Sequence, residues 1–156
     1  MPLSARVRLA LLRILVAPVL TAAACATLDS LLPPAGDQIA LGTWGGDNAG
    51  LIATDSLTHV HIGCTFGDIV GRVMLDADGR FNVSGSYMLR AYPVAVGPMV
   101  PAQFSGQVSG SMLTFSVAVN DTVEKKLVAL GPATVYFARQ PTMGACPICA
   151  VPRRRT

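Results

Sequence analysis

Residues that bind metals or form disulfides gather at two places in this chain. His59, His61 and Cys64 lie within the six residues "HVHIGC", and Cys146 and Cys149 lie within "ACPIC". Imidazole nitrogens and thiolates are ligands that zinc prefers, so the two groups together could form a metal site. Two of the cysteines could instead form a disulfide, and the C-x-x-C spacing also occurs in redox centres.

The alternation of residues places the two histidines on a different face from Cys64. In "LTHVHIGC" apolar residues alternate with His59 and His61, which is typical of a strand with one buried face. Cys64 falls on the apolar side, and only a bulge at Gly63 would bring it across. A structural zinc ion needs about four protein ligands, and a catalytic one about three. We therefore expect solvated histidines. His59 and His61 remain a two-residue metal candidate without further ligands, and no bound metal or cofactor is expected.

A cysteine on the apolar face favours a disulfide if the protein is exported, and the leader described below is the evidence for export. The partner of Cys64 would be Cys146 or Cys149, carried back by the tail beyond the last strand. A bridge of this kind closes a loop of roughly 80 residues and stabilises the fold by up to about 4 kcal/mol in the chain-entropy model. The fourth cysteine, Cys25, lies in the leader described below; once it is lipidated or removed, three cysteines remain for one bond, so one thiol is left over.

Motifs for catalysis are missing from the sequence. Redox C-x-x-C motifs gain a reactive thiolate from a following helix, and the residues after "CPIC" leave no room for one. There is no G-x-S-x-G motif, and Glu124 is the only glutamate. The sequence predicts that the protein is not an enzyme.

The first 26 residues have the layout of a secretory signal. Arg6, Arg8 and Arg13 precede an apolar run from 14 to 20, which gives way to small residues. The apolar run is shorter than the roughly 20 residues that a membrane-spanning helix needs. "LTAAAC" resembles the lipobox of bacterial lipoproteins, although that family usually has Leu where Ala22 stands. The resemblance implies lipidation of Cys25. Ordinary cleavage after Ala24 or Ala26 is the alternative.

Either form of processing predicts an exported protein of the cell envelope, either attached to the membrane by lipid or free. Loss of the leader removes three of the twelve basic residues and leaves nine, equal to the nine acidic residues, all of which follow Cys25. Three of the remaining arginines are the tail 153–155. The domain then has no basic surface stripe, which argues against nucleic acid as a partner.

Short strands between turns follow a linker at 27–38. Apolar and polar residues alternate in "FNVSGSYML" and "MLTFSVAV", and Asp78-Gly79 and Ser109-Gly110 are typical of tight turns. We expect about eight strands, near 39–44, 49–54, 57–64, 68–75, 80–89, 102–109, 111–119 and 133–139. Consecutive strands joined by tight turns predict an all-β fold, a small antiparallel up-and-down barrel over 39–140. Residues 141–156 form a C-terminal tail.

The first expected strand contains Gly42-x-Trp44, and the last ends at Arg139. This arrangement resembles the calycin group, the lipocalins and avidins. That resemblance implies that Trp44 closes the base of the barrel and that Arg139 stacks on it, a contact of about 0.5–2 kcal/mol. The "GTWGG" stretch is also similar to small exported bacterial proteins of unassigned function.

Two functional classes agree with these features. In the first, the barrel is filled and serves the cell envelope as a structural or interaction module with an unknown protein partner. In the second, implied by the calycin resemblance, the barrel holds a small apolar ligand, with the proline-rich connection 91–101 as its rim.

Overall fold

The structure is a computed structural model that describes residues 36–91 and 97–146. The expected signal segment, Cys25, most of the linker, the centre of the proline-rich connection, Cys149 and the arginine tail lie outside these residues. Within them the chain is all β, and no helix is long and apolar enough to cross a membrane. The strands are β1 (Gly42–Gly46), β2 (Ala49–Ala53), β3 (Leu57–Ile62), β4 (Thr65–Val70), β5 (Arg80–Met88), β6 (Val100–Ser109), β7 (Met112–Asp121) and β8 (Lys126–Phe137).

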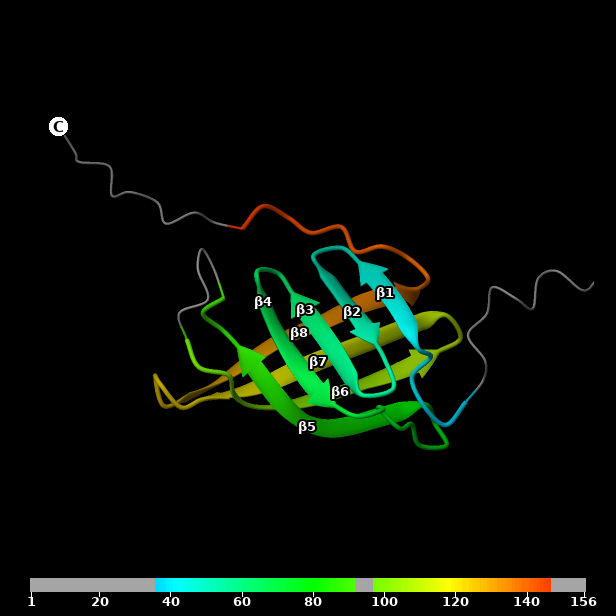
Figure 1. Ribbon diagram of the computed structural model, residues 1–156, viewed down its shortest axis with the longest axis horizontal. Helices are drawn as coiled ribbons and strands as arrows, with labels where there is room; N and C mark the ends of the chain where they lie inside the picture. Colours follow the sequence, from blue (N-terminus) through cyan, green and yellow to red (C-terminus); the bar gives the residue numbers. More distant parts are fainter. Residues whose placement is uncertain (1–35, 92–96, 147–156) are drawn as a thin grey trace, which may run out of the picture. The chain divides into compact units, whose positions relative to one another are not determined.

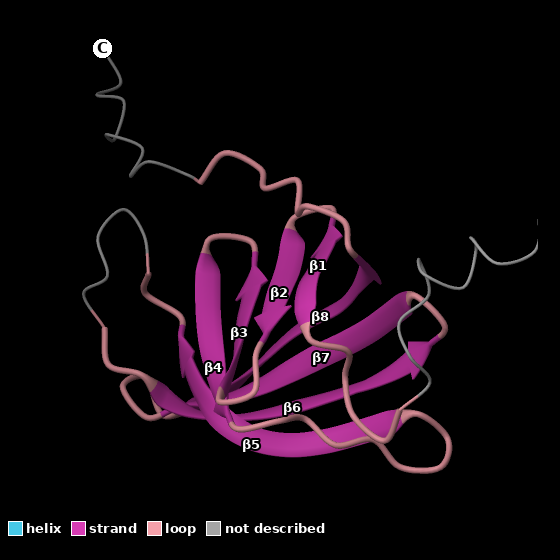
Figure 2. Cartoon of the chain, turned by 45° about the vertical axis from the view of Figure 1, so that its right-hand side comes forward, coloured by secondary structure: helices cyan, strands magenta, loops and turns pink. Residues whose placement is uncertain are grey.

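The eight strands form a closed antiparallel barrel in which each strand pairs with its neighbours in the sequence (Figures 1 and 2). β1 and β8 complete the closure through the pairs Trp44–Phe137 and Gly45–Tyr136. This confirms the predicted all-β, up-and-down barrel of about eight strands. Closure removes most of the free sheet edge that an open meander would expose.

Several strand boundaries differ from the expected ones: β1 starts at Gly42 and β4 ends at Val70, and the starts of β4 and β8 differ for local reasons. The turn between β3 and β4 consists of Gly63 and Cys64, and Gly63 has a φ of 57°, which glycine adopts without strain. β4 therefore starts at Thr65, earlier than expected. β8 starts at Lys126, before the expected start at 133, because it continues through a bulge that contains Gly131 and Pro132. Proline lacks an N–H group and is tolerated at such irregularities.

Side chains fill the inside of the barrel. Alternate residues point inward, as the period of two predicts, and Leu113, Phe115, Val117 and Val119 of β7 are all buried. The largest fully buried side chains come from different strands around the barrel and belong to one apolar cluster: Trp44, Tyr87, Phe104 and Leu113. The indole N–H of Trp44 donates to the carbonyl oxygen of Ala40 at 2.9 Å, so this polar group is satisfied in the core.

After β8 the chain turns back across the outside of the barrel, a segment that we call the C-terminal strap (residues 138–146; Figure 1). Thr142 exchanges backbone hydrogen bonds with Gly46 and Asn48, at 3.0 and 2.8 Å, beside the β1–β2 turn. A Cβ atom on Gly45 would lie 2.3 Å from the strap backbone, and one on Gly50 would lie 2.8 Å from the ring of Pro141. The strap can lie flat on β1 and β2 because these two positions carry no side chain.

Candidate functional site

A chain of three polar side chains crosses the outer face of β3 and β4. Strand register places His59 opposite Asp68, and His61 lies two residues further along β3 on the same face. Nδ1 of His59 lies 2.6 Å from an oxygen of Asp68, and Nε2 of His59 lies 2.9 Å from Nε2 of His61. The His59 and Asp68 side chains are 35% and 29% exposed. The hydrogen bonds hold the three side chains in fixed positions, and the side chains remain accessible to solvent.

The direction of these hydrogen bonds follows from their chemistry. An ionised carboxylate only accepts, so Nδ1–H of His59 donates to Asp68. Nε2 of neutral His59 then has a free lone pair, and Nε2–H of His61 donates to it. Burial lowers the pKa of His61, repulsion from His59 in its protonated form lowers it further, and Asp68 raises it in part; the net lowering favours the neutral imidazole. The arrangement fixes the tautomer of His59.

The histidines form part of a surface groove between the barrel and the C-terminal strap. The groove has a volume of about 280 Å³. It is lined by residues of β1–β3 and of the strap: Thr43, Gly50, Leu51, Ile52, His59, His61, Gln140, Pro141 and Met143. The ring of Phe66 lies beside both imidazoles, with centroids 5.5 and 5.7 Å away. The groove is mostly apolar, and its polar side chains are the two imidazoles, Thr43 and Gln140.

The arrangement differs from a hydrolytic triad in the group that faces the reactive nitrogen. In a Ser/His/Asp triad, a hydroxyl lies against the imidazole nitrogen remote from the carboxylate. Here that nitrogen, Nε2 of His59, faces the second imidazole of His61. The contacts of Asp68, His59 and His61 thus bring together one carboxylate and two imidazoles. No nucleophilic hydroxyl takes part in these contacts.

The cysteines do not take part in this cluster. Cys64 and Cys146 form a disulfide with their Cα atoms 5.5 Å apart, which confirms the first of the two expected pairings. Both sulfurs are therefore unavailable as thiolate ligands. Among residues 36–91 and 97–146, no group of three or more His, Cys, Asp or Glu side chains is placed to hold a metal ion. The remaining cysteine of "CPIC", Cys149, lies outside the described residues.

Trp44 and Arg139 are not stacked on each other, and this expectation was wrong. Trp44 is fully buried and packs edge-on against Phe137, with centroids 5.2 Å apart. The guanidinium of Arg139 lies 5.7 Å from the ring centre of Tyr136. The reason is the pairing register of β1 and β8: Phe137 lies directly opposite Trp44, and Arg139 belongs to the strap beyond the end of β8. Gly42 starts β1 with a φ of 132°.

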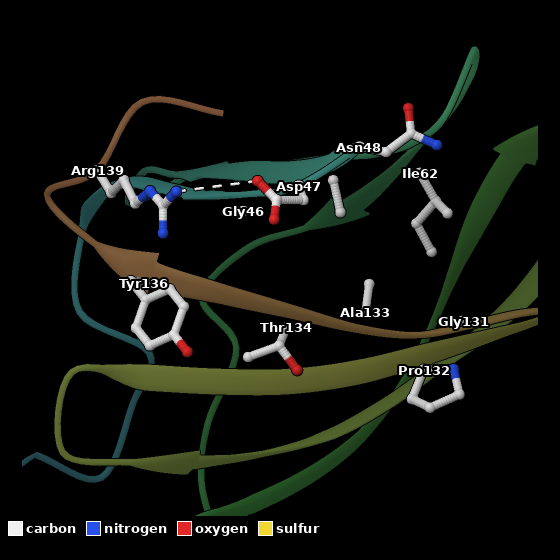
Figure 3. A pocket seen from close by; sticks show the side chains of 11 residues that line it. Gly46, Asp47, Asn48, Ile62, Gly131, Pro132, Ala133, Thr134, Tyr136 and Arg139 are labelled. Atoms are coloured by element: carbon white, nitrogen blue, oxygen red, sulfur yellow. Dashed lines mark ion pairs between the residues drawn. The ribbon is translucent and has the colours of Figure 1, made fainter. Parts of the chain in front are cut away.

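A second hollow lies where β8 separates from β1 (Figure 3). β1 has five residues and β8 has twelve, so residues 126–135 of β8 have strand partners only in β7. The hollow has a volume of about 370 Å³. Figure 3 shows Tyr136 and Thr134 of β8 below the ion pair of Arg139 with Asp47, whose charged atoms are 3.8 Å apart. Its polar lining marks it as a solvated surface hollow.

Sequence reasoning missed Asp68 as the partner of His59. The two-residue turn at Gly63 and Cys64 pairs Ile62 with Thr65 and thereby sets His59 opposite Asp68. Recognition of that turn as a hairpin would have been enough to predict the contact. The strap's part in the groove had no local signal in the sequence.

The fold and the site together define a closed eight-stranded antiparallel barrel with an outward-facing Asp–His–His chain. Searches among family models, curated proteins and solved structures find no match to this chain. The resemblances to calycins and to small exported bacterial proteins therefore stay predictions.

Proposed function

We propose that the protein is an exported, non-enzymatic β-barrel module of the cell envelope that acts through its outer face in a structural or protein-interaction role. The filled interior is the observation that carries this proposal. Trp44, Tyr87, Phe104 and Leu113 converge from β1, β5, β6 and β7 into one buried cluster. A barrel of about eight strands holds either packed side chains or one small ligand, and packed side chains favour a scaffold role.

The leader sequence supports export, and the disulfide is compatible with it. The basic, apolar and small-residue order of 1–26 is that of a secretory signal, and Cys25 stands at a lipobox-like site. The Cys64–Cys146 bond requires an oxidising environment to persist, as exported proteins have. Lipid on Cys25 would attach the barrel to a membrane through the segment before β1.

An apolar patch on the outer face of β2–β4 supports a protein partner. Leu57 and Val70 lie directly opposite each other in the register, and Ile52 lies on the neighbouring strand. Their side chains are 38%, 86% and 51% exposed. We call these three residues the outer apolar patch. Clustered exposed apolar side chains on a folded domain are typical of interaction surfaces.

Photo-crosslinking in the source cells tests the interaction role. A photoreactive residue is placed at position 52 or 70, and a matched control is placed at Asn120, an exposed position on β7. We expect discrete protein adducts from positions 52 and 70 and none from position 120. Equal labelling at all three positions, or a small apolar molecule bound 1:1 in native mass spectra of the purified protein, would contradict the proposal.

Fractionation tests the envelope location separately. The wild-type protein should be found in the membrane fraction, and Cys25→Ala should release it into the soluble exported fraction because the lipid can no longer be attached. Cys149→Ser is the matched control and should stay with the membrane. A wild-type protein that remains in the cytosol with its leader intact would refute export.

A further inference from the structure

The two histidines of the groove have the geometry of a chelating pair. Their Nε2 atoms lie 2.9 Å apart, and both side chains come from one strand, two residues apart. Two nitrogens that each lie about 2.0–2.1 Å from one metal ion are about 2.9 Å apart when the angle at the metal is near 90°. A tetrahedral angle would need about 3.3 Å. The pair therefore fits adjacent corners of a square or octahedral coordination shell.

Asp68 completes the arrangement that metal-binding histidines typically have. A ligating imidazole usually donates its other N–H to a carboxylate, which fixes the tautomer and makes the ligating nitrogen more basic. Asp68 accepts from Nδ1 of His59 at 2.6 Å, so that Nε2 of His59 carries the lone pair and points to His61. The imidazole of His59, one of the two ligands, is thus already oriented for metal binding when no ion is bound.

The surroundings favour copper among the first-row ions. Adjacent nitrogen ligands at 90° suit the square or tetragonal preference of Cu²⁺, and Cu²⁺ also stands highest in the general order of affinities for nitrogen sites. Met143 of the C-terminal strap lines the same groove and is 41% exposed. A methionine thioether is a known weak axial ligand of histidine-bound copper sites.

We propose that His59 and His61 bind a copper(II) ion in the groove under the C-terminal strap, through their two Nε2 atoms, with Asp68 as the positioning carboxylate. The ion replaces the hydrogen between the two Nε2 atoms, and His61 then carries its proton on Nδ1. Water fills the remaining equatorial positions, since the groove offers about 280 Å³ of open space. The site is a property of the imidazole pair and stands or falls independently of the proposed interaction role.

Copper titration of the purified processed protein tests the site. His59 and His61 are the only histidines in the chain, so every imidazole signal must come from this pair. We expect one Cu²⁺ per chain, with an electron paramagnetic resonance spectrum that shows two coordinated nitrogens. His59→Gln or His61→Gln should weaken binding by more than the roughly 10–100-fold that an outer carboxylate contributes. The variant with both His59→Gln and His61→Gln measures how much copper binds elsewhere, at thiols or at the chain terminus.

Asp68→Asn tests the positioning role. It should weaken copper binding by about tenfold, with the two-nitrogen spectrum retained, because an amide supports the imidazole less well than a carboxylate. Asp78→Asn, an exposed carboxylate on the β4–β5 connection, is the matched control and should leave the affinity unchanged. Circular dichroism checks that each variant is folded.

Three results would overturn the proposal. Copper binding that persists unchanged in the double histidine variant would place the ion elsewhere. Tighter binding of Zn²⁺ than of Cu²⁺ would refute the assignment of the metal. Loss of affinity in Asp78→Asn equal to that in Asp68→Asn would show a general charge effect and remove the role of Asp68.

Discussion

Asp121 shows how one buried carboxylate depends on its neighbours. It is 1% exposed at the end of β7 and receives two hydrogen bonds from Arg90, at 2.7 and 3.2 Å. The backbone N–H groups of Val123 and Glu124 also donate to it. The guanidinium contact, assisted by these amides, lowers the pKa of Asp121 from 3.8 to about 2. The charged form is thus strongly favoured in the folded state.

The acid stability of the protein should therefore depend on Asp121. A carboxyl with a lowered folded-state pKa contributes stability above its unfolded value of 3.8, and that contribution is lost as the pH falls toward about 2. We expect wild-type stability to drop between pH 4 and pH 2, and Asp121→Asn to drop less over that interval. Urea denaturation at several pH values measures the free energy of unfolding of each protein. Asn120→Ala, an exposed neighbour without a carboxyl, should follow the wild type, and a parallel decline in Asp121→Asn would contradict the argument.

The strap is the element that connects the disulfide to the groove. It leaves β8 at Ala138, crosses β1 and β2 over Gly45 and Gly50, and ends at the disulfide between Cys146 and the β3–β4 turn. Backbone pairing through Thr142 is its main polar contact with the barrel. Because the strap has few such bonds, the covalent link should be what keeps it in place.

Removal of the disulfide should loosen the strap and destabilise the barrel. The bond joins residues 82 positions apart, and bonds that close long loops typically contribute about 2–4 kcal/mol. We expect Cys64→Ser with Cys146→Ser to lower the free energy of unfolding by about that amount, and amide exchange at Thr142 to accelerate. Chemical denaturation and hydrogen exchange measure the two effects. Cys149→Ser should change neither, and a loss of stability in that variant equal to that of the double variant would show that pairing with Cys149 matters.

Among the strands and turns, those that a local sequence pattern determines could be predicted from the sequence. The alternation in β7 and the turn at Gly110 were sufficient for that strand and its boundary. The first half of β8 escaped prediction because a Gly-Pro pair has the composition of a turn, and only pairing with β7 shows that it is a bulge. The contact of His59 with Asp68 depends on one hairpin register, and the strap depends on tertiary packing over two glycines. Such contacts have no short-range signal.

At the scale of the whole molecule, the barrel is a closed sheet around a solid core with its polar chemistry outside. Inward residues of β6 and β7, such as Phe104 and Leu113, fill the centre, whereas the Asp–His–His chain and the outer apolar patch lie on β2–β4. A core of this kind gives the outer face a rigid support. It also separates the stability of the barrel from the outward side chains of the groove, so residues such as His59, His61 and Met143 can change without loss of the fold.

A cavity made in the core should reveal whether the interior is filled. Leu113 is fully buried, and Leu→Ala changes at such sites cost about 2–5 kcal/mol and leave an apolar space that can bind benzene. We expect Leu113→Ala to lose stability in that range and to bind benzene in NMR titrations, whereas the wild type binds none. Leu127→Ala, the same change at a side chain that is 74% exposed, should cost about 0.5 kcal/mol or less. Saturable benzene binding by the wild type would instead favour the ligand-holding barrel, because a filled core has no room for the added molecule.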